Sequence, residues 1–221
     1  MIERNYYVQK LFQWKEREVI KVLSGIRRCG KSTVFSLYIE ALKKSGVSDE
    51  QIIHINLEDM ANASLLTAQS LNSYIEQHLC KNKWTYVFLD EIQQCVEFEK
   101  AINSLHLKEK VDIYITGSNA YFLSGELATL LSGRYITIHV FPLSFKEYLQ
   151  FTRSKESSTE LSTETLKQDF NDYVRFGSFP YVPSLNKNQD EINTYLEGVY
   201  STILLKDVAQ REKINDISVL Q

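Results

Sequence analysis

Cysteine and proline are scarce in this chain, which has three of each among 221 residues. The cysteines, Cys29, Cys80 and Cys95, lie far apart, are odd in number and lack metal-ligand spacing, which is typical of free thiols in a reducing compartment. No apolar run approaches the roughly 20 residues that span a bilayer. The first ten residues, MIERNYYVQK, contain no apolar signal region. These absences predict a cytoplasmic protein that does not enter the membrane.

An excess of positive charge is also lacking, because 25 Lys and Arg stand against 28 Asp and Glu, for a net charge of -3. Non-specific attraction to nucleic acid is therefore not expected. Hydrophobic residues make up 43% and charged residues 24%, as in ordinary globular proteins. A chain of this length can form one substantial core and a small second unit.

Strand-like and helix-like stretches alternate over the first two thirds of the chain. The runs rich in β-branched and aromatic residues are 17–24, 52–58, 84–91, 111–119 and 134–141. Helix-like stretches between them are 32–46, 70–80, 98–107 and 124–131. This alternation predicts an α/β fold, with a parallel five-stranded sheet, helices on both faces and right-handed crossovers.

The pattern changes after Phe141. The stretch PLSFKEYLQF predicts a helix that starts at a proline, and TRSKESSTELSTET resembles a surface loop. Two further helical stretches follow, separated by SFPYVPSLNKN. We therefore expect an α/β domain over residues 1–141 and a small helical subdomain over residues 142–221.

The segment GIRRCGKST has the spacing Gly-x-x-x-x-Gly-Lys-Ser of a phosphate-binding loop, and it lies between a predicted strand and a predicted helix. Its glycines let backbone N–H groups turn inward, and the helix N-terminus adds partial positive charge. Lys31 would reach the β- and γ-phosphates, and the Ser32 hydroxyl would bind Mg²⁺. The alternative is a basic turn that starts a helix. The predicted nucleotide-binding residues are Gly25, Arg28, Cys29, Gly30, Lys31, Ser32 and Thr33.

A second motif, YVFLDE, places two acidic residues at the end of an apolar strand. Asp90 would hold a Mg²⁺-bound water beside Ser32. Glu91 would polarise the water that attacks the γ-phosphate. The alternative is a helix N-cap followed by a first-turn acid, because EIQQCVEFEKAI is helix-like.

These motifs resemble those of P-loop ATPases of the AAA type. The stretches ITGSNAYFLSGELATLLSGR and FPLSFKEYL narrow the resemblance to a group of prokaryotic AAA-like ATP-binding proteins, and FGSFPYV and LLKDVAQREKINDISVL are similar to its helical region. The resemblance implies the sheet order 5-1-4-3-2, with nucleotide at the carboxyl edge of strands 1 and 3, which agrees with the rule for doubly wound sheets. It also implies a further C-terminal domain, nuclease-like and of unknown role, that this chain would lack.

The resemblance nominates further site residues. Asn119 would be the polar sensor of the γ-phosphate, with Thr116 and Ser118 as rivals and a turn residue as the alternative. Arg134 would be an arginine finger, in cis or in trans, or would simply cover the sheet edge. Other candidate cations are Arg27, Arg28, Arg175 and Arg211.

The base would lie against the N-terminal segment, which nominates Tyr6, Tyr7 and Leu11, although these residues could equally belong to the core. ATP is favoured over GTP because the chain has no Asn-Lys-x-Asp stretch to read guanine.

The leading functional hypothesis is a Mg²⁺-dependent ATPase whose hydrolysis drives conformational change. The alternatives are an ATP-binding switch or scaffold with little hydrolysis and, third, a P-loop kinase. The expected partners are the nucleotide, a protein of unknown identity and, through the lacking C-terminal domain, nucleic acid. The oligomeric state stays open.

Overall fold

The computed structural model describes residues 3–118, 131, 133–153 and 162–203. The chain divides into two compact units. The sheet unit comprises Asn5–Gly25 and Lys31–Val140, and the helical unit comprises Met1–Arg4, Ile26–Gly30 and Phe141–Gln221. Each unit is described by itself.

The sheet unit contains five parallel strands in the order β2-β3-β4-β1-β5, which is the predicted order read from the other edge. Their bounds are β1 Ile20–Gly25, β2 Ile52–Asn56, β3 Thr85–Asp90, β4 Val111–Ser118 and β5 Tyr135–His139. In the register of the sheet, Gly25 pairs with Ser118 and Asn56 pairs with Asp90. The ends of β1, β2, β3 and β4 therefore lie at one edge.

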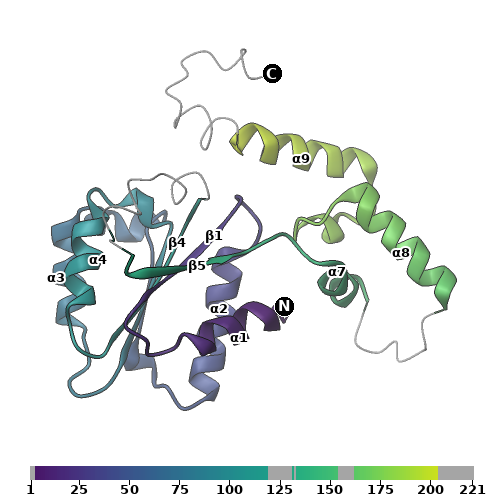
Figure 1. Cartoon of the computed structure of the whole chain (residues 1–221). Helices are drawn as coiled ribbons and strands as arrows, with labels where there is room; N and C mark the ends of the chain where they lie inside the picture. The colour runs from purple at the N-terminus through teal and green to yellow at the C-terminus, as the bar shows by residue number, and fades with distance from the viewer. Residues whose placement is uncertain (1–2, 119–130, 132, 154–161, 204–221) are drawn as a thin grey trace. The chain divides into compact units, whose positions relative to one another are not determined.

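Helices cover both faces of this sheet, as Figure 1 shows. One pair is α1 Asn5–Gln13 and α2 Lys31–Lys44, and the other is α3 Ala68–Gln77 and α4 Phe98–His106. Short 3₁₀ turns add η1 Asp49–Gln51, η2 Met60–Leu65 and η3 Ile92–Gln94. The predicted helix over 124–131 lies almost wholly outside the described residues. The helix-like stretch 91–102 divides into η3 and the start of α4.

Alternation along β3 and β4 sends different side chains to the two faces. Val87 and Ile113 join the aliphatic core under α3 and α4. Phe88 and Tyr114 point the other way and stack with ring centroids 4.7 Å apart. Tyr38 of α2 meets both of these rings, at 6.0 and 5.3 Å. One face of the sheet is thus aliphatic and the other aromatic.

The helical unit contains α7 Phe145–Thr152, α8 Thr163–Phe176, η4 Val182–Leu185 and α9 Gln189–Ile203. Helix α7 does not begin at the proline of PLSFKEYLQF but after Ser144, whose hydroxyl accepts a bond from the Glu147 N–H while the Glu147 carboxylate caps Ser144 in return. This capping box satisfies N–H groups that the first helical turn leaves unpaired. No helix in the described ranges is both long and apolar enough to cross a bilayer.

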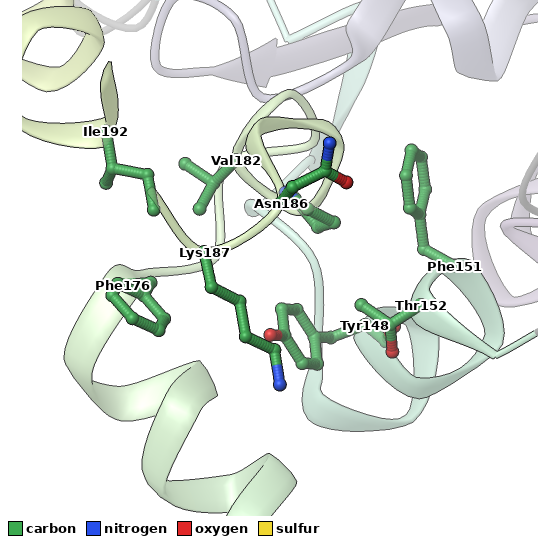
Figure 2. Close-up of a pocket in the computed structure, with 9 residues that line it drawn as sticks. Tyr148, Phe151, Thr152, Phe176, Val182, Asn186, Lys187 and Ile192 are labelled. Atoms are coloured by element: carbon green, nitrogen blue, oxygen red, sulfur yellow. The ribbon is translucent and has the colours of Figure 1, made fainter. Parts of the chain in front are cut away.

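A pocket of about 360 Å³ lies within the helical unit, and Figure 2 shows the side chains that line it. Tyr148 comes from α7, Phe176 from the end of α8 and Ile192 from α9. Lys187 lies at its rim, with its ammonium 2.5 Å from the Asp172 carboxylate. The lining is mostly apolar, and the pocket contains no residue of the phosphate-loop motif.

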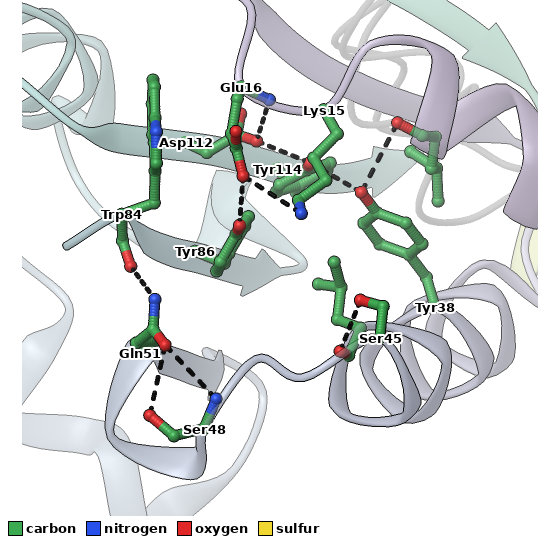
Figure 3. A network of polar contacts seen from close by, with 12 residues as sticks. Lys15, Glu16, Tyr38, Ser45, Ser48, Gln51, Trp84, Tyr86, Asp112 and Tyr114 are labelled. Carbon is green, nitrogen blue, oxygen red and sulfur yellow. Dashed lines mark hydrogen bonds and ion pairs between the residues drawn. The ribbon is translucent and has the colours of Figure 1, made fainter.

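A buried polar network lies at the amino-terminal edge of the sheet (Figure 3). Lys21, the second residue of β1, and Asp112, the second residue of β4, form a fully buried ion pair with an Nζ–Oδ1 distance of 2.5 Å. Asp112 also accepts bonds from the Tyr114 hydroxyl and the Glu16 N–H, both at 2.8 Å. Burial raises the pKa of the Asp112 carboxyl and lowers that of the Lys21 ammonium, so three donors to one carboxylate are what keep the charged pair in place.

Replacing one partner of this pair should be costly because it leaves the other charge buried. Asp112→Ala is expected to lower the free energy of unfolding by about 3–5 kcal/mol, measured by urea denaturation. The matched control is Asp49→Ala, which breaks the exposed contact of Asp49 with Lys43 and should cost less than about 1 kcal/mol. Equal losses in the two variants would contradict this assignment.

Candidate phosphate-binding site

The phosphate-loop motif bridges the end of β1 and the start of α2. Gly25 is the last residue of β1 and Lys31 the first residue of α2. Two residues between them have left-handed backbones, Arg28 with φ 62° and Gly30 with φ 99°. Glycine adopts such a conformation without strain, whereas for Arg28 it costs about 1 kcal/mol or more. Left-handed residues in a turn direct successive N–H groups to one side, which forms an anion-binding concavity.

Helix α2 supplies the cation of the site. Lys31 is buried, and its ammonium donates a hydrogen bond to the Gly25 carbonyl at 3.0 Å. The next two side chains, Ser32 and Thr33, are exposed in the first turn of the helix. The first N–H groups of a helix lack intrahelical partners and favour anions. The start of α2 therefore combines a fixed positive charge with accessible hydroxyl groups.

The acidic half of the site lies at the end of β3. Asp90 is the last residue of that strand and is only 1% exposed. Thr116 of β4 contacts both acidic positions, because its hydroxyl donates to Asp90 Oδ1 and accepts a bond from the Glu91 N–H at 3.0 Å. A neighbouring strand thereby fixes the direction of the buried carboxylate and of the next peptide.

Glu91 has a left-handed backbone, with φ and ψ both 52°. This conformation is uncommon for a residue with a side chain and turns the chain sharply out of the sheet. The Glu91 carboxylate lies 4.0 Å from the Lys31 ammonium and accepts a 2.5 Å bond from the Gln93 amide. The structure thus brings Gly25, Lys31, Asp90 and Glu91 together within the sheet unit.

Other nominated residues lie elsewhere. Asn119 is outside the described residues, and so is Arg211. Arg134 precedes β5, and its carbonyl accepts a bond from Ile20 N at 2.9 Å, which places it at the amino edge of the sheet. That edge is separated from Gly25 by the length of β1, about 17 Å. Within its own subunit, Arg134 does not reach the phosphate loop.

The residues nominated for base recognition belong to α1. Tyr7 and Leu11 are buried in the core of the sheet unit, where the Leu11 carbonyl accepts a bond from the Tyr38 hydroxyl at 3.5 Å. Tyr6 is 62% exposed. In the helical unit, Arg175 donates to the Gln189 side chain on α9. Tyr7 and Leu11 are therefore core residues of the sheet unit.

Two contacts of the motif residues were not foreseen from the sequence. Gln93 binds Glu91 directly, and only its place two residues after the acidic pair could have suggested it. Arg4 donates to the Cys29 carbonyl of the loop at 2.8 Å. No local pattern signals that contact, because the two residues are 25 positions apart.

A family model described as an AAA domain matches residues 17–149, which is more than half of the chain. The chain belongs to this AAA family. An uncharacterized protein of Haemophilus influenzae is 37% identical over the whole chain, which covers 54% of that protein. An uncharacterized protein of Methanocaldococcus jannaschii is 32% identical over 91% of this chain, a match that covers 44% of the relative. The chain thus spans about half the length of these relatives.

Solved structures of AAA-type P-loop ATPases share the fold. The Walker-type ATPase of Pyrococcus abyssi superposes with a TM-score of 0.57 at 13% identity, over 97% of this chain and 75% of that one. DnaA of Aquifex aeolicus, solved with bound AMPPCP, superposes with a TM-score of 0.53 at 17% identity, over 96% of this chain and 65% of DnaA. The ORC1 protein of Aeropyrum pernix, solved in complex with DNA, superposes with a TM-score of 0.55 at 14% identity, over 91% of this chain and 64% of that protein. The predicted P-loop fold is confirmed.

The double contact of Thr116 can be tested by removing only its hydroxyl. Thr116→Val keeps the shape of the side chain but deprives Asp90 of a donor and the Glu91 N–H of its acceptor. We expect a loss of about 1–3 kcal/mol in the free energy of unfolding. The control Thr137→Val changes an exposed position of β5 and should stay within about 0.5 kcal/mol. A Thr116 variant as stable as the control would show that these bonds contribute nothing.

Proposed function

We propose that this AAA-family chain binds ATP and hydrolyses it to ADP and phosphate. The observation that carries the proposal is the grouping of Lys31, Asp90 and Glu91 at the carboxyl edge of the sheet, with the lysine 4.0 Å from the glutamate. Ligands bind at this edge in doubly wound sheets. AMPPCP, bound in the DnaA neighbour, is an ATP analogue, which supports the same ligand class here.

The loop and the start of α2 support the proposed phosphate binding. In this structure the Lys31 ammonium donates to the neutral Gly25 carbonyl. Charged phosphate oxygens would be stronger acceptors for it than that carbonyl. Backbone N–H groups of the loop and of the first turn of α2 would bind the remaining oxygens. The residues proposed to contact the nucleotide are Gly25, Arg28, Cys29, Gly30, Lys31, Ser32 and Thr33.

Hydrolysis needs a base beside the γ-phosphate. Water attacks phosphorus, the bond to the β–γ bridging oxygen breaks, and its electron pair leaves with ADP. Glu91 would take the proton of the attacking water, because its carboxylate lies beside the lysine that binds the phosphates. The polar sensor expected at Asn119 remains a prediction, and Thr116 now has the contacts of a positioning residue for both acids.

The donor set suits Mg²⁺. Ser32 offers an exposed hydroxyl in the first turn of α2, and Asp90 offers a buried carboxylate whose direction Thr116 fixes. Oxygen donors from one or two side chains, completed by water and phosphate, are what Mg²⁺ prefers. When bound, the ion neutralises charge on the β- and γ-phosphate oxygens.

The mechanism is tested by Glu91→Gln, which keeps the size of the side chain but removes the base. Steady-state ATP turnover is expected to fall by about 10²-fold or more while ATP affinity is retained. Glu97→Gln is the matched control, since Glu97 also has a left-handed backbone, φ 54°, at the start of the next helix, and its carboxylate pairs with Lys100. The control should hydrolyse ATP at the wild-type rate.

Wild-type protein that binds ATP without turnover would refute the ATPase assignment. A rate per subunit that rises with protein concentration would support an arginine finger in trans, the role still proposed for Arg134. The chain spans about half of its relatives' length. That the whole protein acts on a protein or nucleic acid partner is therefore also a proposal.

A switch with little hydrolysis is the second candidate, and Gln93 favours it. Its amide holds Glu91 Oε2 at 2.5 Å, which occupies an oxygen that a base needs for water. A carboxylate restrained in this way would accept the proton of water less readily, so that bound ATP would be hydrolysed slowly.

Releasing this restraint should raise the rate. Gln93→Leu is expected to increase ATP turnover about threefold or more, because one hydrogen bond to a charged group is lost. The neighbouring exposed residue Gln94 supplies the control variant, Gln94→Leu, which should leave turnover unchanged. Slower turnover in Gln93→Leu would mean instead that Gln93 orients Glu91 for the reaction.

A further inference from the structure

Arg4 is an arginine almost completely buried in the helical unit, with 2% of its side chain exposed. Its guanidinium donates to the carbonyl oxygen of Cys29 at 2.8 Å and to those of Phe141 and Pro142 at 2.7 and 3.3 Å. It also pairs with both carboxylate oxygens of Glu147, at 3.0 and 3.4 Å. One side chain therefore holds the phosphate loop, the segment before α7 and the first turn of α7.

The bond from Arg4 to the Cys29 carbonyl also sets the direction of the Gly30 N–H. The Cys29 carbonyl and the Gly30 N–H belong to the same peptide unit, which is planar and, in this structure, trans. The two groups therefore point in opposite directions. By holding the carbonyl on its own side, the Arg4 guanidinium directs the Gly30 N–H away from itself.

Gly30 packs in ordinary contact range of Arg4. A Cβ at this position would lie 3.4 Å from Arg4 Nη1 and 3.7 Å from Pro180 Cγ. A flip of the Cys29–Gly30 peptide would also turn an N–H towards the guanidinium and place two donors against each other. The direction of this peptide is thus favoured by the charge of the guanidinium.

Glu147 keeps the guanidinium in place. Its Oε2 also accepts bonds from Ser144 N at 2.8 Å and Ser144 Oγ at 2.9 Å. Burial raises the pKa of the Glu147 carboxyl, but the bonds from Arg4 and Ser144 outweigh this effect and leave it below its ordinary value. Glu147 is therefore ionised at neutral pH, and the pair with Arg4 is charge-assisted.

We propose that Arg4 is a positioning residue for nucleotide binding, which orients the Gly30 N–H towards the phosphates through the Cys29 carbonyl. The inference rests on the proposed ATP binding and adds a residue outside both motifs. Glu147 acts with Arg4, so the cap of α7 and the shape of the phosphate loop depend on the same carboxylate.

The test compares ATP and ADP affinities of wild type, Arg4→Met and Arg4→Lys by calorimetry. Arg4→Met is expected to bind both nucleotides about tenfold or more weakly, and Arg4→Lys to recover only part of this loss, because an ammonium cannot span carbonyls and carboxylate together. The matched control is Arg153→Met, which breaks the pair of Arg153 with Asp169 in the same unit, away from the loop. Its affinities should stay within about twofold of wild type.

Steady-state ATP turnover distinguishes a positioning role from general destabilisation. If the loop binds substrate and transition state equally well, Arg4→Lys should raise KM and leave kcat nearly unchanged. Thermal unfolding of each variant shows whether weaker binding follows lost stability. A folded Arg4→Met that binds ATP as wild type does, or an affinity loss that tracks stability equally in Arg153→Met, would overturn the proposal.

If Arg4→Met fails to fold, Glu147→Gln decides, because glutamine can still accept bonds from Ser144 but no longer pairs a charge with Arg4. It should bind ATP about threefold or more weakly, and wild-type affinity in this variant would overturn the inference. Wild-type protein without affinity for ATP would refute the proposed function and this inference with it. Wild-type binding that survives loss of Arg4 refutes the inference alone.

Discussion

The candidate site depends on one constraint, the common direction of all five strands. In a parallel sheet the carboxyl ends of neighbouring strands meet at one edge, so Gly25, Asp90 and the end of β4 are neighbours although the sequence separates them widely. Strand pairing brings only the strand ends together. The direction of the side chains that follow is set by sharp turns, which have left-handed backbones at Arg28, Gly30 and Glu91.

The opposite edge of the same sheet has a different character. There Lys21 and Asp112 are buried without solvent access, and Asp112 accepts a bond from the Tyr114 hydroxyl, which also contacts the Tyr38 hydroxyl. At the carboxyl edge Glu91 and Ser32 retain contact with solvent. The buried charges of the amino edge are paired with each other, whereas the carboxyl edge also presents polar side chains to solvent.

Much of this could be read from the sequence. The parallel sheet was predictable from the alternation of strands and helices, whereas the strand order followed from the resemblance to AAA-type ATPases. The place of the phosphate-loop motif between a strand and a helix, and that of the acidic pair at the end of a strand, were predictable from local spacing. The contacts of Arg4 and Thr116 were not predictable in this way, since they form between segments distant in sequence. Arg134 directly precedes β5, and the residue before a strand of a parallel sheet lies at its amino edge, so this placement could also have been read from the sequence.

The left-handed backbone of Glu91 has a consequence for how this protein can change. Glycine or asparagine would adopt φ 52° and ψ 52° with less strain than glutamate does. A selection for heat resistance alone would therefore favour Glu91→Gly, and with it the disappearance of the carboxylate from the rim. The backbone strain at Glu91 and the role proposed for its carboxylate therefore make opposite demands on the residue at this position.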